Sequence, residues 1–478
     1  MPVETSAKKH TPSHLFTALK HNTQNRPFKE IQTIQGQVPP KLNGVLYRNG
    51  PGIFTRGKHH KGTLLDGDGV VQRLELKNGR VFYSRQFVET KKLQAENQAQ
   101  AFLNPSWTSK APKALANIGG RVPSQAGVTA YVVHNTLLAL DEVAPAYQLN
   151  PKTLQTLGPA NLGLPKNDQF IKAHSRYLPT SDAWVFLSTR MGRKGLQISL
   201  VRHYANGQQK LTPTVQAPRM VYLHDFAATE RYAILILQPA FLRLMPFLSG
   251  ATTFSESLQW QPEQGNRILV IDFDTGACQQ FEAPAAWVWH FTNAYHNKNE
   301  LIVDFVGYDN PDHFLGPKAQ LAAIMRDEIG TIGAPPTLRR YHINLANSQL
   351  KESQVAEGCH EFPSINLQQS TKAYDTVYTT FAPQHKGILH SQIAATQIEN
   401  GHVKSYNFGP HVNVLEPIYA QCTNKQGWLI SQILDTQKNT SAYAIFKANR
   451  VNDGPVALID LNETVPISFH GYWLPQPA

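Results

Sequence analysis

Four of the nineteen histidines share one kind of surroundings, the edge of an apolar segment with the composition of a β-strand. They are His174 in IKAHSR, His224 in VYLHDFA, His290 in WVWHFTN and His470 in ISFHGYW. The first three are separated by 50 and 66 residues, which is close to one blade of a β-propeller with its insertions, at roughly 40–50 residues per blade. Because the innermost strands of a propeller converge on its axis, such distant side chains can meet. Any single histidine can also be structural or exposed.

The chemistry of these side chains narrows the choice of metal. Neutral imidazoles bind Zn, Cu, Ni or Fe, and open positions beside them suit Fe(II) that must bind O2. The chain has no HExxH motif, since His360-Glu361 continues as Phe-Pro-Ser. The three cysteines, Cys278, Cys359 and Cys422, lie too far apart for a CxxC ligand pair or a disulfide framework. They favour a reducing, cytoplasmic compartment and give no support to zinc.

Three glutamates also lie in strand-like apolar segments, namely Glu142 (LLALDE), Glu361 (CHEFP) and Glu416 (VNVLEP). An unpaired carboxylate in such a position is costly, so we expect each to have a partner. The ring N–H of a metal-bound histidine is a suitable partner, because a carboxylate there fixes the tautomer of the ring. A salt bridge or a glutamate at the end of a turn is the simpler alternative, which the sequence alone favours.

The composition is that of a globular protein. Of the 478 residues 41% are hydrophobic and 17% are charged, and the net charge is +11. The basic residues are dispersed, which argues against nucleic acid, whereas attraction to an anionic membrane surface explains the charge equally well. The most apolar stretch, residues 232–250, is interrupted by prolines and Arg243, so no membrane span is expected. No GxSxG, GxGxxG or P-loop motif occurs.

Short β-branched and aromatic runs followed by polar turns recur from about residue 45 to the C-terminus. Examples are residues 183–189 (AWVFLST), 232–237 (YAILIL), 301–307 (LIVDFVG) and 428–434 (WLISQIL). Turns such as 77–79 (KNG) and 399–401 (ENG) have hairpin chemistry. Repetition of strand, tight turn and strand is typical of a β-propeller. We predict an N-terminal arm, residues 1–35, followed by one all-β propeller domain, residues 36–478, with few helices, one of them at 320–326.

Seven short motifs, taken together, resemble those of the carotenoid cleavage oxygenases. In chain order they are 46–52 (LYRNGPG), 66–69 (DGDG), 137–142 (LLALDE), 224–226 (HDF), 361–363 (EFP), 416–417 (EP) and 470–473 (HGYW). Each motif is weak alone, but their joint presence in this order is specific. The resemblance covers nearly the whole chain and is greatest to the bacterial apocarotenoid oxygenases.

This resemblance implies a seven-bladed β-propeller with a helical and loop dome over one face, and Fe(2+) on the axis. It implies that the metal ligands are His174, His224, His290 and His470. It also pairs Glu142 with His224, Glu361 with His290 and Glu416 with His470, and leaves His174 without a carboxylate. The expected activity is that of a non-heme Fe(II)-dependent dioxygenase, which cleaves a C=C bond of a carotenoid or apocarotenoid with O2 into two carbonyl products. The 15,15' bond of an apocarotenoid is the expected target.

A polyene substrate requires an apolar tunnel, and a membrane is where such substrates dissolve. Four aromatic side chains next to the motifs are candidates to line a tunnel, although core packing explains them equally well: Tyr222, Trp289, Phe362 and Phe469. The apolar segment 239–250 is either a buried loop or, by the resemblance, a patch for peripheral membrane association. Its candidate lipid-facing residues are Phe241, Leu242, Leu244, Met245, Phe247 and Leu248.

Two other functions compete with this interpretation. Relatives that cleave stilbenes or other phenylpropanoids typically have a lysine just before the glutamate that corresponds to Glu142, whereas this chain has Asp141. That difference favours a polyene. A metal-free, non-catalytic carotenoid-binding propeller is the second alternative, and the presence of all four histidines and all three glutamates speaks against it. The sequence does not indicate an oligomeric state.

Overall fold

The computed structural model describes residues 17–143, 145–166, 170–193, 195–422 and 427–476. These residues form seven antiparallel sheets of four to six strands, which are the blades of a β-propeller, and two further two-stranded sheets. The predicted all-β, seven-bladed fold is therefore confirmed. Among the described residues, no helix is both long enough and apolar enough to span a bilayer.

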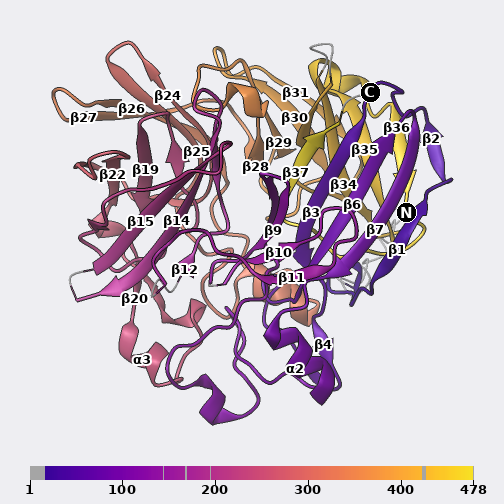
Figure 1. Ribbon diagram of the computed structural model, residues 1–478, viewed down its shortest axis with the longest axis horizontal. Coiled ribbons are helices and arrows are strands. Elements are labelled where there is room, and N and C mark those ends of the chain that lie inside the picture. The colour runs from indigo at the N-terminus through magenta and orange to yellow at the C-terminus, as the bar shows by residue number, and fades with distance from the viewer. Residues whose placement is uncertain (1–16, 144, 167–169, 194, 423–426, 477–478) are drawn as a thin grey trace, which may run out of the picture.

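The first and last parts of the chain share blade 1. In spatial order it contains β1 (Arg26–Glu30), β7 (Arg80–Phe87), β6 (Gly69–Lys77), β3 (Gly44–Pro51) and β37 (His470–Pro475). Blade 7 is completed in the same way, by β2 (Ile34–Gly36), β36 (Ala457–Asp460), β35 (Thr440–Lys447), β34 (Gly427–Asp435), β33 (Ile418–Gln421) and β32 (Val412–Val414). Figure 1 shows the indigo N-terminal strands beside the yellow C-terminal strands. The ring is thus closed by strand pairing between the two ends of the chain.

The other five blades follow one another along the chain. Blade 2 contains β8 (Thr129–Val133), β9 (Thr136–Leu140), β10 (Tyr147–Leu149) and β11 (Thr156–Pro159). Blade 3 contains β12 (Phe170–Ile171), β13 (Arg176–Leu178), β14 (Ala183–Gly192), β15 (Gly195–Tyr204), β16 (Gln209–Leu211) and β17 (Val215–Gln216). Blade 4 contains β18 (Ala227–Ala228), β19 (Tyr232–Leu237), β22 (Asn266–Asp272) and β23 (Cys278–Ala283).

Blade 5 contains β24 (Trp287–Asn297), β25 (Glu300–Tyr308), β26 (Thr337–Asn344) and β27 (Gln349–Gln354). Blade 6 contains β28 (Cys359–Ser364), β29 (Thr376–Ala382), β30 (Gln392–Gln397) and β31 (Val403–Asn407). Two short 3-10 helices lie in connections between blade strands: η5 (Leu367–Gln369) between β28 and β29 of blade 6, and η6 (Ala448–Asp453) between β35 and β36 of blade 7.

Tight turns and apolar blade faces explain why this sequence forms these sheets. Between β6 and β7, Asn78 and Gly79 both have positive φ, 52° and 78°, as a two-residue type I′ hairpin requires. Neighbouring blades then pack face to face. One core cluster, for example, joins Ile234 and Ile268 of blade 4 to Val303 of blade 5. The hydrophobic core therefore lies between the blades, around the axis.

The dome is built from the connections between strands on one side of the ring, and Figure 1 shows α2, α3 and β4 gathered there. Its elements are β4 (Thr55–Arg56), β5 (His59–His60), α2 (Lys91–Ala99), η1 (Ala114–Asn117), β20 (Ala240–Leu242), α3 (Leu244–Leu248), η2 (Ser255–Ser257), β21 (Leu258–Trp260), η3 (Pro262–Gln264), α4 (Gln320–Ala323) and η4 (Ile324–Arg326). The helix predicted at 320–326 is formed by α4 and η4. The helical and loop dome expected from the resemblance is therefore present.

Part of the predicted N-terminal arm, residues 1–35, is paired with the propeller. β1 pairs with β7 along the edge of blade 1, and β2 pairs with β36 along the edge of blade 7. Residues 1–16 lie outside the described part of the chain. From Arg26 onward, the arm supplies outer strands to the two blades that close the ring.

Arg48 on β3 reinforces this closure, and its removal should weaken the fold. Its guanidinium is fully buried and donates to the backbone oxygens of Glu416 (2.7 Å) and Phe469 (3.2 Å). We expect Arg48→Met to lower the free energy of unfolding by about 3 kcal/mol, because it leaves buried acceptors without a donor. The exposed Arg450, which pairs with Asp453, is the matched control, with an expected loss below about 1 kcal/mol for Arg450→Met. Denaturant titration measures both, and equal losses would contradict a closing role for Arg48.

Candidate metal centre

The four predicted histidines lie on or beside the innermost strands of four blades. His174 lies between β12 and β13, His224 lies just before β18, His290 belongs to β24, and His470 begins β37. All four are buried, with exposed fractions of 4–8%. The three predicted glutamates come from the other three blades, since Glu142 follows β9, Glu361 belongs to β28 and Glu416 lies between β32 and β33. Each of the seven blades therefore supplies one group to the axis.

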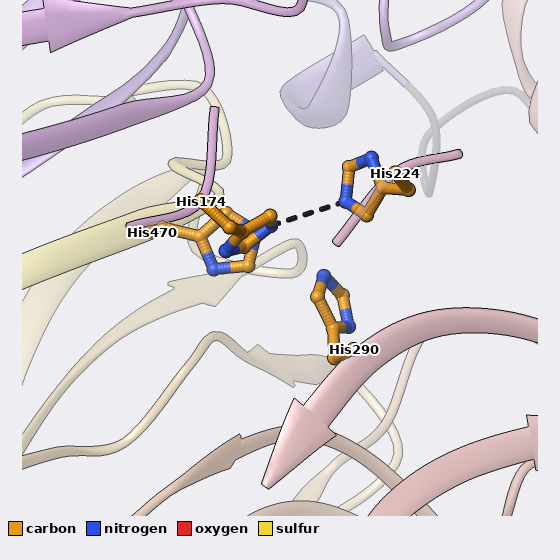
Figure 2. Close-up of side chains that lie close together, drawn as sticks. All are labelled: His174, His224, His290 and His470. Atoms are coloured by element: carbon orange, nitrogen blue, oxygen red, sulfur yellow. Dashed lines mark hydrogen bonds between the residues drawn. The ribbon is translucent and has the colours of Figure 1, made fainter. Parts of the chain in front are cut away.

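The four imidazoles converge on one point. One ring nitrogen from each histidine lies within 4.8 Å of the corresponding nitrogen of every other. The Nε2 atoms of His174 and His224 are 3.1 Å apart, and Figure 2 shows a ring nitrogen of His224 directed toward His174, with His290 and His470 close by. Adjacent rings are steeply inclined, by 71° for His174 and His224 and by 71° for His290 and His470. Such a cluster of lone pairs is the arrangement expected of metal ligands.

The three glutamates bond to the far side of three of these rings. Glu361 Oε2 lies 2.6 Å from His290 Nδ1, Glu416 Oε1 lies 2.9 Å from His470 Nδ1, and Glu142 Oε1 contacts His224 Nδ1. An ionised carboxylate accepts only, so each Nδ1 carries the proton and each Nε2 presents its lone pair to the centre. Among the described residues, no carboxylate forms an ion pair with His174. These pairings match those that the resemblance implied.

Further hydrogen bonds hold the carboxylates in place. Tyr222 donates its hydroxyl to Glu142 Oε1 at 3.2 Å, and Tyr308 donates to Glu361 Oε1 at 2.8 Å. Lys172 Nζ lies 3.4 Å from Glu142 Oε2, and its side chain is buried. Sequence reasoning missed Lys172 and Tyr308. The only signal for Lys172 in the sequence is its position two residues before His174.

Burial and charge set the protonation of this cluster. Burial alone would raise the pKa of Glu361, but the His290 imidazole and hydrogen bonds from Phe362 and Tyr308 outweigh it and lower that pKa to about 2. Burial, followed by the neighbouring imidazoles, holds the pKa of His174 well below its ordinary value. The carboxylate of Glu361 is therefore ionised and the His174 ring neutral at physiological pH. A neutral His174 ring can offer its lone pair to a metal, and an ionised Glu361 can accept the proton-bearing nitrogen of His290 and orient that ring.

Asp225, in the HDF motif, fixes the relative position of two histidine segments. Its carboxylate accepts a hydrogen bond from the backbone N–H of Phe291 at 2.9 Å and pairs with Arg176. The residue before it is His224, and the residue before Phe291 is His290. One buried carboxylate thus ties blade 4 to blade 5 beside the metal centre.

A cavity of about 130 Å³ opens beside the centre. His224, His290 and His470 form part of its wall. Most of the rest is apolar and comes from the dome and the inner strands, including Leu64, Leu65, Trp107, Leu321, Ile388 and Ile467. All four aromatic residues predicted to line a tunnel are in this wall: Tyr222, Trp289, Phe362 and Phe469. Their contact with a substrate remains a prediction.

The predicted lipid-facing segment is only partly exposed. Met245 is 74% exposed, whereas Phe247 is 3% exposed and packs into the core, so the expectation that Phe247 faces lipid is wrong. Phe241 and Leu242 are half-buried and pack against core clusters, because β20 and β21 pair there. Leu244 and Leu248 are also half-buried. An apolar run of sequence does not show which side of a short helix faces the core.

Comparison with known proteins identifies the family. Residues 19–475 match the family model described as retinal pigment epithelial membrane protein (RPE65). The chain belongs to this family of carotenoid oxygenases. The resemblance seen in the sequence is thereby confirmed.

Relatives in the carotenoid oxygenase family span nearly the same length. The apocarotenoid-15,15'-oxygenase of Synechocystis is 26% identical, over 93% of this chain and 92% of its own. The isoeugenol monooxygenase of Pseudomonas nitroreducens is 25% identical, over 93% of this chain and 94% of its own. A solved structure of the Synechocystis apocarotenoid oxygenase in cobalt-substituted form superimposes with a TM-score of 0.90 at 25% identity, covering 97% of this chain and 99% of that one.

Metal content separates a ligand from a residue that orients it. We expect His224→Ala to lose the bound metal, and Glu142→Gln to keep the site but weaken metal affinity by about 10- to 100-fold, because the amide no longer fixes the His224 tautomer. Titration with Co²⁺ or Fe²⁺, followed by metal analysis, measures both. The partly exposed His342, which pairs with Glu300, is the control, and His342→Ala should bind as the unaltered protein does. Full occupancy in His224→Ala would refute the assignment.

Proposed function

We propose that this protein is a non-heme Fe(II)-dependent dioxygenase that cleaves a C=C bond of a carotenoid or apocarotenoid with O2. The products are two carbonyl compounds, and the 15,15' bond of an apocarotenoid is the proposed target. The observation that carries the proposal is the convergence of four buried histidine nitrogens beside an apolar cavity, whose wall includes the three histidines that carboxylates orient, His224, His290 and His470. The relatives named for cleavage of apocarotenoids and carotenoids support it.

The donor set fits Fe(II). Four neutral imidazoles leave the charge of a bound ion undiminished and occupy four positions, so that positions remain open for O2. The carboxylates do not reach the metal position; they hydrogen-bond to the outer ring nitrogens of the histidines and so orient the rings. Bound there, iron would supply the activation of O2 next to an alkene. His174, His224, His290 and His470 are the residues that would hold it.

The chain itself contributes placement and exclusion of water. A conjugated polyene has many electronically similar double bonds, so the bond that lies beside the centre is the one that reacts. Trp289 packs edge-on against His224, with ring centroids 4.9 Å apart, and Phe362 lies 5.1 Å from His290. These rings would hold the polyene against the centre, and their π faces would stabilise positive charge that develops along it.

Labelled oxygen tests the reaction directly. We expect the iron-loaded protein to bleach an apocarotenal aerobically and to release two carbonyl products, each carrying one atom from ¹⁸O2. Mass spectrometry of the products, with rapid extraction to limit exchange with water, provides the measurement. Metal-free protein prepared with a chelator serves as the control. A single labelled product would indicate a monooxygenase, and no bleaching would refute polyene cleavage.

Cleavage of a phenylpropanoid double bond is the second candidate. Isoeugenol monooxygenases from two Pseudomonas species match over 92–93% of this chain at 24–25% identity. A resveratrol cleavage oxygenase from Aspergillus fumigatus matches 86% of it at 25% identity. Product analysis with a phenolic alkene, run beside the apocarotenal, separates the two substrate classes.

We further propose peripheral association with the cytoplasmic face of a membrane. Two dome segments meet at one end of the molecule, where the Gly119 N–H donates to the Leu248 oxygen at 2.7 Å. Three apolar side chains of this surface are strongly exposed: Leu115 (83%), Ile118 (54%) and Met245 (74%). Exposed basic residues lie in the same segments, namely Lys110, Lys113, Arg121 and Arg243. An exposed apolar surface flanked by basic residues is the arrangement expected to bind an anionic lipid surface.

Vesicle binding tests this surface. We expect Leu115→Ser combined with Met245→Ser to reduce co-sedimentation with anionic vesicles several-fold, because each exposed apolar side chain contributes buried area on insertion. The same double change at Leu157 and Leu211, which are 61% and 48% exposed on blades 2 and 3, is the control. Equal binding by all three proteins would exclude the dome as the docking surface.

A further inference from the structure

One charged group in the wall of the cavity is not part of the histidine and glutamate network. Asp141 follows β9 and is 2% exposed. Backbone amides hold its carboxylate in place, since the N–H of Gln125 donates to Oδ2 at 2.8 Å and the N–H of Glu142 donates to Oδ1 at 2.6 Å. It lines the same cavity as Trp107, Leu64 and Leu65. A fixed carboxylate therefore stands in a largely apolar wall, one residue from the glutamate that orients His224.

The nearby cation is already paired elsewhere. Lys172 contacts Glu142, and Asp141 forms no ion pair within the described part of the chain. Burial raises the pKa of Asp141 to about 6, although hydrogen bonds from the two backbone amides and from Trp107 oppose the rise. The group is therefore mainly ionised at neutral pH. An ionised carboxylate accepts hydrogen bonds at about four positions and donates none, so these three donors leave room for another.

We propose that Asp141 accepts a hydrogen bond from a hydroxyl group of the substrate and thereby determines specificity. This inference rests on the proposed function and names the substrate class more closely, as an alkene with a hydroxyl group at one end. A hydroxyl is the group required, because a carboxylate bonds to a donor, and an ether, an aldehyde or a hydrocarbon end offers none. A ring hydroxyl of a polyene and a phenol share this chemistry.

The position of Asp141 also bears on which bond is cleaved. Asp141 and Glu142 are adjacent, and Glu142 is bonded to His224, so the hydroxyl would be held on the His224 side of the centre. The rest of the substrate would extend along the apolar wall. Fixing one end in this way sets the register of the double bonds against the centre. Asp141 would thus act by orientation, without a part in oxygen chemistry.

Matched ligand pairs test the proposal without any substitution. One pair is isoeugenol and its O-methyl ether, and the other is an apocarotenal with and without a ring hydroxyl. Quenching of the intrinsic tryptophan fluorescence, measured without O2 on the metal-loaded protein, gives the dissociation constants. We expect the hydroxylated member of at least one pair to bind about 10- to 100-fold more tightly, as for a hydrogen bond to a charged group. The pair that shows the preference indicates whether the substrate is a phenol or a hydroxylated polyene.

Substitution then assigns the preference to Asp141. Asp141→Asn should weaken binding of the hydroxylated member to the level of its partner and leave the partner unchanged. The exposed Asp375 is the matched control, and Asp375→Asn should keep the full preference. Thermal unfolding and metal content show whether each variant is intact. If Asp141→Asn does not fold, the proposal is tested by the hydroxyl preference of the unaltered protein for the two ligand pairs.

The outcomes separate this inference from the proposed function. Equal binding within both pairs, or an equal loss for both members in Asp141→Asn, would overturn the role of Asp141. A clear hydroxyl preference without aerobic cleavage of any of the four compounds would support the role of Asp141 in binding and refute the proposed oxygenase. A hydroxyl preference together with aerobic cleavage would support both the role of Asp141 and the proposed oxygenase, provided that kcat/KM is higher for the compounds that bind more tightly.

Discussion

The protein depends on the orientation of four imidazole rings at the axis. A histidine side chain rotates freely in water, and four of them with lone pairs directed at one point repel each other. Here three rings are held by a carboxylate on Nδ1, so the proton stays on the outer nitrogen and Nε2 faces inward. The carboxylates are anions in an apolar interior, which is costly unless they are paired. Lys172, Tyr222 and Tyr308 supply part of that compensation, and a bound cation would supply more.

The propeller makes this arrangement rigid. Each group at the axis lies in or next to a strand of a different blade, so the pairing of a whole sheet fixes its position. Closure of blade 1 by β37 places His470 next to His174 and His290, with ring centroids 4.5 and 4.8 Å apart, and the pairing of β3 with β37 joins the two ends of the chain. Any slip in one blade would move one ligand relative to the rest. The strand pairing that stabilises the propeller is therefore also what fixes the geometry of the metal centre.

Substrate choice is largely separable from the metal centre. The three glutamates are committed to the histidines and to donors such as Lys172, Tyr308 and the Gly471 N–H, so they do not serve substrate recognition. Specificity therefore belongs to the remaining wall, where apolar residues from the dome meet the inner strands. A single polar residue in such a wall has a large effect, since water does not compete with it. Family members can therefore share one centre and differ in substrate.

The sequence by itself indicated the fold class and the residue types of the centre, and the resemblance of its motifs to a known family supplied the ligand set and the pairing of glutamates with histidines. Its histidines and glutamates in strand-like contexts, its hairpin turns such as Asn78-Gly79, and its β-branched runs are local features that a sequence displays directly. Tertiary structure alone decided which side chains meet. It buried Phe247, enclosed Lys172 against Glu142, and paired β1 and β2 with blades formed by residues far along the chain. These outcomes depend on how sheets pack around an axis, and no local pattern encodes that packing.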